Sequence, residues 1–236
     1  MSDRLDQVLA AVGSRVEHLA PPTERPGRTE PGWHDCGAIT AADLDRALDE
    51  AETGDRQVAA SLLLQSYAYR VAGISLAAYA VGLPWPSPAA PSTSVRLAGG
   101  RARAVRYGAA PLGPAGDARS LAEALFPGHL VRIVAALRAS QRLGERLVWA
   151  NVAASCAAAF RAVEGAARDR GDAAEQAAVR DRALALFDQA PWLASTGSFE
   201  ARGAEWRWQR SACCLWYRTS GGRTCEGCSL TRAERA

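Results

Sequence analysis

The chain has 236 residues, a mass of 25.0 kDa and a formal net charge of +3. This length allows one large domain or two small ones, and 48% hydrophobic and 22% charged residues are typical of a globular protein and not of a disordered one. The near balance of 28 basic and 25 acidic residues gives no bulk-charge argument for binding nucleic acid. We therefore expect no nucleic-acid partner.

No run of residues has the roughly 20 consecutive apolar positions that a transmembrane helix needs. The two best candidates, 71–85 and 147–160, are interrupted by glycine, proline or polar residues. The N-terminus has acidic residues and an amphipathic pattern where a signal peptide would have a basic start and an apolar run. We expect no transmembrane segment and a cytoplasmic protein with reduced thiols, with peripheral attachment to the inner face of the membrane left open.

Hydrophobic periodicity predicts a mainly helical body. Thr40 with Asp43 resembles a capping box, Asp55 is a second helix start, and Pro127 suits the first turn of a later helix. Proline-rich and glycine-rich residues 21–38 and 84–93 predict loops. The predicted helices cover residues 2–19, 40–52, 55–82, 127–141, 144–168 and 173–188.

A short β-hairpin is predicted between the helices. Residues 94–98 and 102–107 alternate in hydrophobicity on either side of Gly99 and Gly100, and a glycine pair between alternating runs is a hairpin signal. Two strands alone are marginally stable, so the hairpin must lie on the helices.

The expected fold class is therefore mainly α, a helical domain with a small β-hairpin insertion and a C-terminal cysteine-rich metal-cluster tail. The helical domain would cover residues 1–204, with the hairpin near 94–107, and the tail residues 205–236. The tail is too small for a core of its own, so a bound metal centre would replace that core. Trp206 and Trp208 are expected to pack the tail against the helices.

Four of the six cysteines are clustered near the C-terminus: Cys213, Cys214, Cys225 and Cys228. In a reducing compartment such a cluster indicates a metal site more than a disulfide framework. The pattern C-C-x10-C-x2-C suits either one tetrahedral zinc or an iron–sulfur cluster. In the C-x2-C half, Gly227 would tolerate unusual backbone torsions.

The adjacent cysteines Cys213 and Cys214 help to distinguish a zinc site from an iron–sulfur cluster. Zinc sites usually take ligands two to four residues apart, and neighbouring side chains in a strand point to opposite faces unless the backbone bends. A binuclear cluster is wider than one ion and accepts such a pair in more ways. The spacing favours iron–sulfur over zinc and leaves both open.

Residues 210–218 and 221–230, around the paired cysteines and the C-x2-C turn, closely resemble the C-terminal signature of FhuF-type ferric-siderophore reductases. In addition, Arg146-Leu-Val-Trp149-Ala-Asn151 resembles the family's R-x-L-W-x-N element. The specific similarity covers about twenty residues and a looser one most of the chain, whereas residues 1–60 add nothing.

The resemblance implies an iron–sulfur oxidoreductase of iron uptake. A 2Fe–2S cluster on the four cysteines would transfer one electron to the Fe(III) of a siderophore and release Fe(II) in the cytoplasm. No catalytic residue beyond the cluster is required, and the electron would come from an external donor of the ferredoxin or flavin-reductase type. The alternative is a non-catalytic siderophore-binding or structural protein in which the four cysteines hold a zinc ion.

Other side chains receive weaker assignments. Cys156 and His129 are expected to be structural, and Trp149 with Asn151 to pack between helices and donate hydrogen bonds. Backbone N–H groups of 221–224 and 226–227 and nearby arginines would tune the cluster. Four residues are candidate substrate contacts: Arg210, Trp216, Tyr217 and Arg218. If these do not contact the chelate, we expect docking in the groove between the hairpin and the 144–168 helix.

Overall fold

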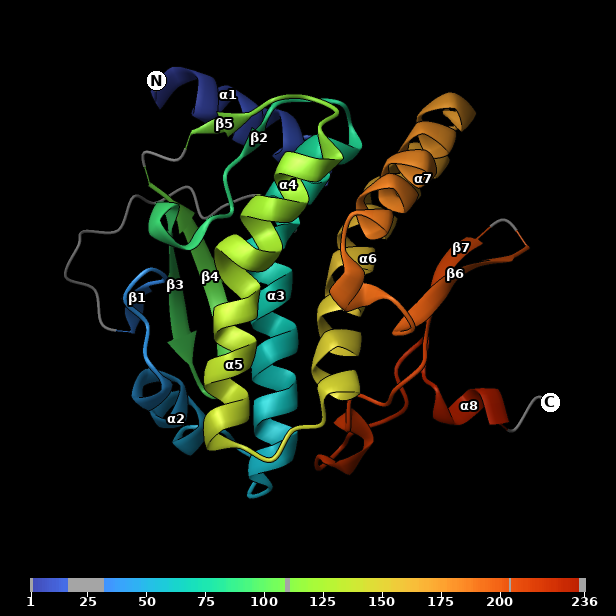
Figure 1. The fold of residues 1–236 in the computed structure, drawn as a ribbon. Helices are drawn as coiled ribbons and strands as arrows, with labels where there is room; N and C mark the ends of the chain where they lie inside the picture. Colours follow the sequence, from blue (N-terminus) through green and yellow to red (C-terminus); the bar gives the residue numbers. More distant parts are fainter. Residues whose placement is uncertain (1, 17–31, 109–110, 204, 234–236) are drawn as a thin grey trace.

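A computed structural model describes residues 2–16, 32–108, 111–203 and 205–233. Its centre is a pair of long helices, α3 (Arg56–Ala80) and α6 (Glu145–Asp169), which lie along one another (Figure 1). Helix α3 is buried almost all round, as its nearly unbroken apolar sequence requires. Small residues on α6, such as Ala153 and Ala157, allow the two backbones to come close.

The other long helices surround this pair and largely match the predicted ranges. Thr40 and Asp43 form the predicted capping box, and the Asp55 carboxylate accepts the first N–H groups of α3. The first helix ends at Gly13 and not near Leu19, which lies outside the described residues. The surrounding helices are α1 (Ser2–Gly13), α2 (Ala41–Asp49), α4 (Ala118–Leu125), α5 (Val131–Ser140) and α7 (Ala173–Asp188).

The prediction that a helix starts at Pro127 is wrong. Helix α4 begins after Asp117, whose side chain accepts the Ser120 N–H, and runs through a π-helical turn at Phe126–Leu130 into α5. The wider turn accommodates a proline, which lacks the N–H that a regular α-helix would use there. The stretch Ala118–Ser140 is long and apolar enough to cross a membrane, and half of its most hydrophobic window is buried inside the fold.

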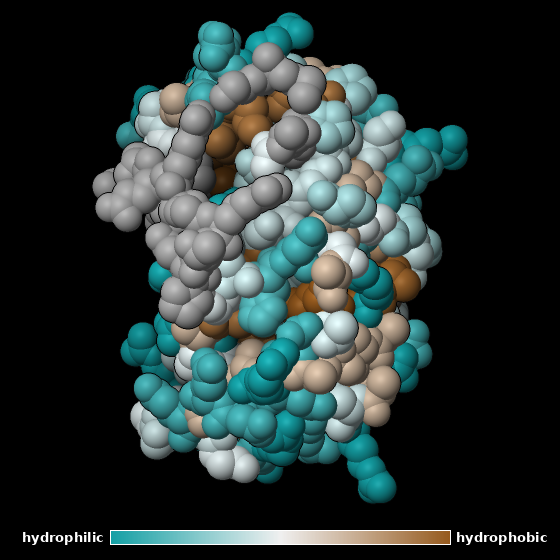
Figure 2. Space-filling view, turned by 90° about the vertical axis from the view of Figure 1, so that its left-hand side faces the viewer, coloured by the Kyte–Doolittle hydropathy of each residue, from teal (hydrophilic) through white to brown (hydrophobic). Residues whose placement is uncertain are grey.

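The predicted hairpin is confirmed as β3 (Thr93–Ala98) and β4 (Arg101–Tyr107), with positive φ at Gly99 and Gly100. It packs on α3, where the Tyr107 hydroxyl donates to the Val71 carbonyl at 2.6 Å. The sequence did not predict β1 (Trp33–Asp35), which adds to the edge of β3 from a segment expected to be loop. Strands β2 (Trp85–Pro86) and β5 (Leu112–Gly113) form a separate short pair. The face with β1 and α2 is mostly hydrophilic, with small hydrophobic patches (Figure 2).

A second hairpin, also absent from the prediction, connects the helices to the cysteines. It consists of β6 (Gly197–Arg202) and β7 (Glu205–Arg210), so the expected boundary between residues 204 and 205 falls between its two strands. Phe199 stacks on Trp206 with ring centroids 3.9 Å apart, and Trp208 lies against Phe187 of α7. The predicted packing role of both tryptophans is confirmed, and the cysteines follow directly after this hairpin.

Candidate metal centre

The four C-terminal cysteines lie on two loops that flank a short 3-10 turn at Trp216–Arg218, and the red C-terminal segment passes close to the start of α6 (Figure 1). The Sγ atoms of Cys214 and Cys225 are 3.9 Å apart. Burial raises the pKa of Cys213, and a side-chain hydrogen bond with Cys228 adds to this effect. Among the described residues, no three His, Cys, Asp or Glu side chains converge as a single-ion site. The thiols therefore meet as two pairs, Cys214 with Cys225 and Cys213 with Cys228.

The backbone bends immediately after the adjacent cysteines. Leu215 has a φ of 66°, in the left-handed region that a branched residue seldom adopts. Its N–H lies 3.4 Å from the Cys213 sulfur, and the N–H of Trp216 is directed at Cys214. This is the bend that the sequence required if both sulfurs were to face one centre. Among the described residues, the N–H groups directed at cysteine sulfurs come from this turn, and donation from the glycine-containing loops stays a prediction.

The C-x2-C turn is held against the end of β7. The Arg210 N–H donates to the Gly227 carbonyl at 3.0 Å, and the Gln209 amide donates to the Cys228 carbonyl at 3.2 Å. A Cβ atom at Gly227 would lie 2.0 Å from the carbonyl oxygen of Trp208. Glycine is therefore required by this close approach. The sequence suggested unusual backbone torsions as the reason, but Gly227 is not among the residues with positive φ.

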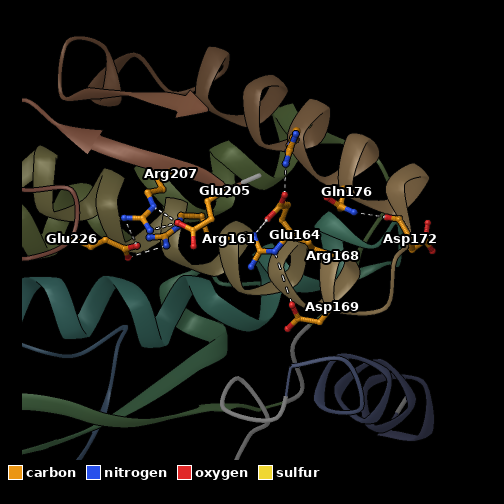
Figure 3. A network of polar contacts seen from close by, with 10 residues as sticks. Arg161, Glu164, Arg168, Asp169, Asp172, Gln176, Glu205, Arg207 and Glu226 are labelled. Carbon is orange, nitrogen blue, oxygen red and sulfur yellow. Dashed lines mark hydrogen bonds and ion pairs between the residues drawn. The ribbon is translucent and has the colours of Figure 1, made fainter. Parts of the chain in front are cut away.

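Charged side chains attach the same turn to the helical body. Glu226, between Cys225 and Gly227, pairs with Arg161 of α6 at 2.9 Å and with Arg207 of β7 at 3.0 Å (Figure 3). Further along α6, the buried Glu164 pairs with Arg168 and with Arg180 of α7. These contacts hold hairpin, helix and cysteine turn in one arrangement.

Arg210 lies in the interior and not at a docking surface. It is 3% exposed and its guanidinium donates to the side-chain Oδ1 of Asn151. The Asn151 amide donates to the Ser61 hydroxyl at 2.8 Å, and that hydroxyl donates to the Cys214 carbonyl at 2.7 Å. A continuous buried network therefore joins α6, α3 and β7 to the cysteine pair.

The charge of Arg210 has no carboxylate partner within the described ranges, and its Nε atom has no hydrogen-bond partner there. The pKa of Cys214 is lowered to about 6, first by its hydrogen bond with Cys225 and also by the charge of Arg210. The pKa of Cys225 is raised, mainly by the same bond. A buried cation needs a compensating negative charge. Four thiolates around iron and sulfide would provide one, so the residues present fit an anionic iron–sulfur centre.

The other candidate contacts lie further out. Tyr217 is 46% exposed, Trp216 is half-buried, and Arg218 pairs with Asp55 at 2.5 Å. Cys36 and Cys156 are fully buried in the core, as expected for Cys156.

A comparison with family models gives a match over residues 61–196 to the family described as ferric iron reductase FhuF-like transporter. This range is more than half of the chain. The chain belongs to the FhuF-like family. Comparisons with curated proteins and with solved structures gave no match. The match begins at Ser61 of the buried network and ends just before β6, and the four cysteines lie beyond it.

Two residues of the candidate site could not be assigned from the sequence. Ser61 sits in a long apolar helix and gives no signal of its own. Glu226 could be read as a spacer within C-x2-C, although its ion pairs are part of what positions the turn. Asn151 was expected to donate hydrogen bonds between helices, and this is confirmed by its contacts with Ser61.

Proposed function

We propose that this FhuF-like protein is a ferric-siderophore reductase that uses a 2Fe–2S cluster on Cys213, Cys214, Cys225 and Cys228. The observation that supports this most directly is the arrangement of the four thiols as two pairs beside the buried, uncompensated charge of Arg210. Membership in a family of ferric iron reductases supplies the reaction class.

The reaction needs an electron and a place to deliver it. Siderophores hold Fe(III) with hard oxygen donors, and the softer Fe(II) is held much less tightly. The bound cluster would supply one electron, obtained from an external ferredoxin or flavin reductase. The product would be Fe(II), released in the cytoplasm. No proton transfer or nucleophile is needed.

The chain's own residues set the conditions for this transfer. The N–H groups of Leu215 and Trp216 point at ligand sulfurs, and such bonds raise the reduction potential. The charge of Arg210 favours the more negative, reduced state, and Asn151 fixes the guanidinium. Cys214 and Cys225 would bind one iron, and Cys213 and Cys228 the other.

Purified protein tests the cofactor. We expect charge-transfer absorption between about 400 and 550 nm, with iron and acid-labile sulfide in equal amounts. Serine at any of the four ligands should lower both contents, whereas Cys36→Ser should leave them unchanged. A colourless protein with one zinc per chain would instead support the structural alternative. In Mössbauer spectra of the reduced protein, Cys214→Ser and Cys225→Ser should perturb the same iron, and different irons would refute the pairing.

Activity is tested with ferric hydroxamate and ferric catecholate chelates. Protein reduced with dithionite and freed of excess reductant should yield one Fe(II) per cluster, trapped by a ferrous chelator. NADPH alone should give none, because the sequence has no nucleotide-binding fingerprint. A cluster-loaded protein that reduces no ferric chelate would contradict the proposed function.

A further inference from the structure

An open cavity of about 370 Å³ lies between α3, α6 and the start of β4. This is the groove between the hairpin and the long helix that the sequence offered as the alternative docking place. Its volume falls in the range of small-molecule sites. Its polar lining includes Gln65, Tyr69 and three arginines, namely Arg70, Arg101 and Arg103.

The cavity is strongly cationic. None of its lining residues is acidic, and among the described residues none of the three arginines forms an ion pair. Arg103 uses its Nε to donate to the Ala98 carbonyl at 3.1 Å, which orients the side chain without neutralising it. Arg101 is half-buried; burial and the charge of Arg103 lower its pKa, and the charge of Glu52 in the α2–α3 loop acts in the opposite direction. Such a surface favours an anionic ligand over a neutral one.

The cavity is also adjacent to the cysteines. Ser155, in its wall, donates to the carbonyl oxygens of Gln65 and Asn151 at 2.8 and 2.9 Å. Asn151 continues through Ser61 to the Cys214 carbonyl. A ligand in the cavity would be separated from the proposed electron carrier by this short buried network.

We propose that this cavity binds the ferric siderophore, and that Arg70, Arg101 and Arg103 select a chelate with net negative charge, such as a tris-catecholate. The assignment rests on the proposed function, because it identifies where and in which charge state its substrate binds. Three bidentate catecholates leave Fe(III) with a charge of about −3, whereas a tris-hydroxamate is neutral. The phenolate oxygens around the metal are acceptors for guanidinium N–H groups.

Gallium(III) chelates test binding separately from reduction, since Ga(III) has the charge and coordination of Fe(III) and is not reduced. With cluster-loaded protein, we expect Ga(III) tris-catecholate to bind more tightly than the neutral Ga(III) tris-hydroxamate. Arg101→Gln and Arg103→Gln should each raise the Kd of the catecholate about tenfold, with a smaller effect at high salt. Arg119→Gln, which removes an exposed charge from α4, is the matched control and should change nothing.

A variant that changes shape and not charge completes the test. Ala158 lines the cavity from α6, and Ala158→Phe should fill the space and weaken binding of both chelates. The proposal is overturned if all three cavity variants have normal cluster content and bind Ga(III) tris-catecholate like wild type, or if wild type does not bind it. Reduction of ferric chelates by the same preparations would show that the proposed function stands even then. The cavity proposal is also overturned if the cavity variants lose electron uptake from the donor while their chelate binding is unchanged.

Discussion

Arg210 brings a full positive charge into the protein interior, where its described hydrogen-bond acceptor is the neutral side chain of Asn151. Sequence position alone suggested a surface contact for the substrate, because the residue is three positions from Cys213. Its burial changes that interpretation. At the proposed cluster, a fixed charge beside the cysteines would act on the redox equilibrium and not on docking.

Replacing Arg210 should therefore lower the reduction potential of the cluster. We expect Arg210→Gln to shift the midpoint negatively by on the order of 50 mV, since about 59 mV corresponds to 1.4 kcal/mol for one electron. Arg210→Lys keeps the charge and should remain closer to wild type. Potentiometric titration of protein with full cluster content measures both, and Arg223→Gln, at an exposed position, is the control. An unchanged potential in Arg210→Gln would exclude the tuning role.

His129 is a second buried titratable residue, and it is structural as expected. Its Nδ1–H donates to the Pro88 carbonyl at 2.6 Å, and its Nε2 accepts from the Tyr67 hydroxyl at 2.7 Å. Burial lowers the pKa of His129 to about 4, and the charge of Arg132 contributes in the same direction. The imidazole is thus neutral in the folded protein at neutral pH.

This predicts acid-sensitive stability. The unfolded chain binds the proton near pH 6.5 and the folded chain only near 4, so the free energy of unfolding falls as pH drops between these values, by about 3 kcal/mol in total. Urea denaturation between pH 7 and 4.5 measures this dependence. The His129→Gln variant should be less stable at pH 7 and lose less stability on acidification. Parallel pH curves for the two proteins would contradict the assignment.

The C-x2-C turn shows how one element depends on another at close range. A Cβ atom at Gly227 would lie 2.0 Å from the Trp208 carbonyl oxygen. A Cβ atom at Gly165 would meet only the end of the Arg168 side chain, at 3.5 Å. The first glycine is required by the approach of two backbone segments. The second occupies a helix interior, where glycine weakens the helix.

Alanine at these two glycines should have opposite effects. Gly227→Ala should displace the turn from β7 and reduce the iron and sulfide content by more than half. Gly165→Ala should retain the cluster and raise the free energy of unfolding by about 0.5–1 kcal/mol. Metal analysis and urea denaturation test the pair. Normal iron content in Gly227→Ala would mean that the close contact does not position the ligands.

The elements that could be predicted are those whose signals are local. The Thr40 capping box, the Asp55 cap and the Gly99-Gly100 hairpin are each encoded within a few residues. Strand β1 was not predictable, because it forms by pairing with β3 about sixty residues later in the chain. The start of α4 could not be predicted, because Pro127 is typical of a helix start. A π-helical turn that accommodates a proline inside a longer helix has no sequence signal.

At the scale of the whole molecule, the chain consists of a helical body with its own core and a cysteine segment attached through β7. The buried hydrophobic core reaches as far as Trp206 and Trp208, and beyond Arg210 only Cys214 and Cys228 of the described apolar residues are buried. We therefore expect the segment after Arg210 to depend on the proposed metal centre and on its contacts with the body.

Removal of the cluster should disorder one part and spare the other. In apo-protein we expect fast amide hydrogen exchange across residues 211–233, with unchanged protection in α3 and α6 and little change in far-UV circular dichroism. The hairpin β6–β7 should stay protected, because its aromatic contacts do not involve the cysteines. Loss of protection in α3 would indicate that the cluster stabilises the body as well.

The cysteine segment and the helical body also differ in how much of the site could be predicted from the sequence. The four candidate ligands could be named from the sequence because their spacing is itself the signal. The second part of the site, Ser61, Asn151 and the arginine-lined cavity, comes from α3, α6 and β4, and Ser61 and Asn151 alone are 90 positions apart. Asn151 and the groove were expected from the sequence, but only the tertiary fold shows that Ser61 and the three arginines join them.

The placement of the cavity on the helical body, and of the cysteines on a short appended segment, has an evolutionary consequence. If the proposed function holds, a descendant that lost residues 211–233 would keep every wall of the cavity and lose the proposed electron carrier, so a single truncation would turn a reductase into a binding protein for the same chelate. The family match lies entirely on the body and would score both proteins alike. Within genomes, the paired cysteines after β7 are therefore the feature by which reductases should be distinguished from binding proteins of the same lineage.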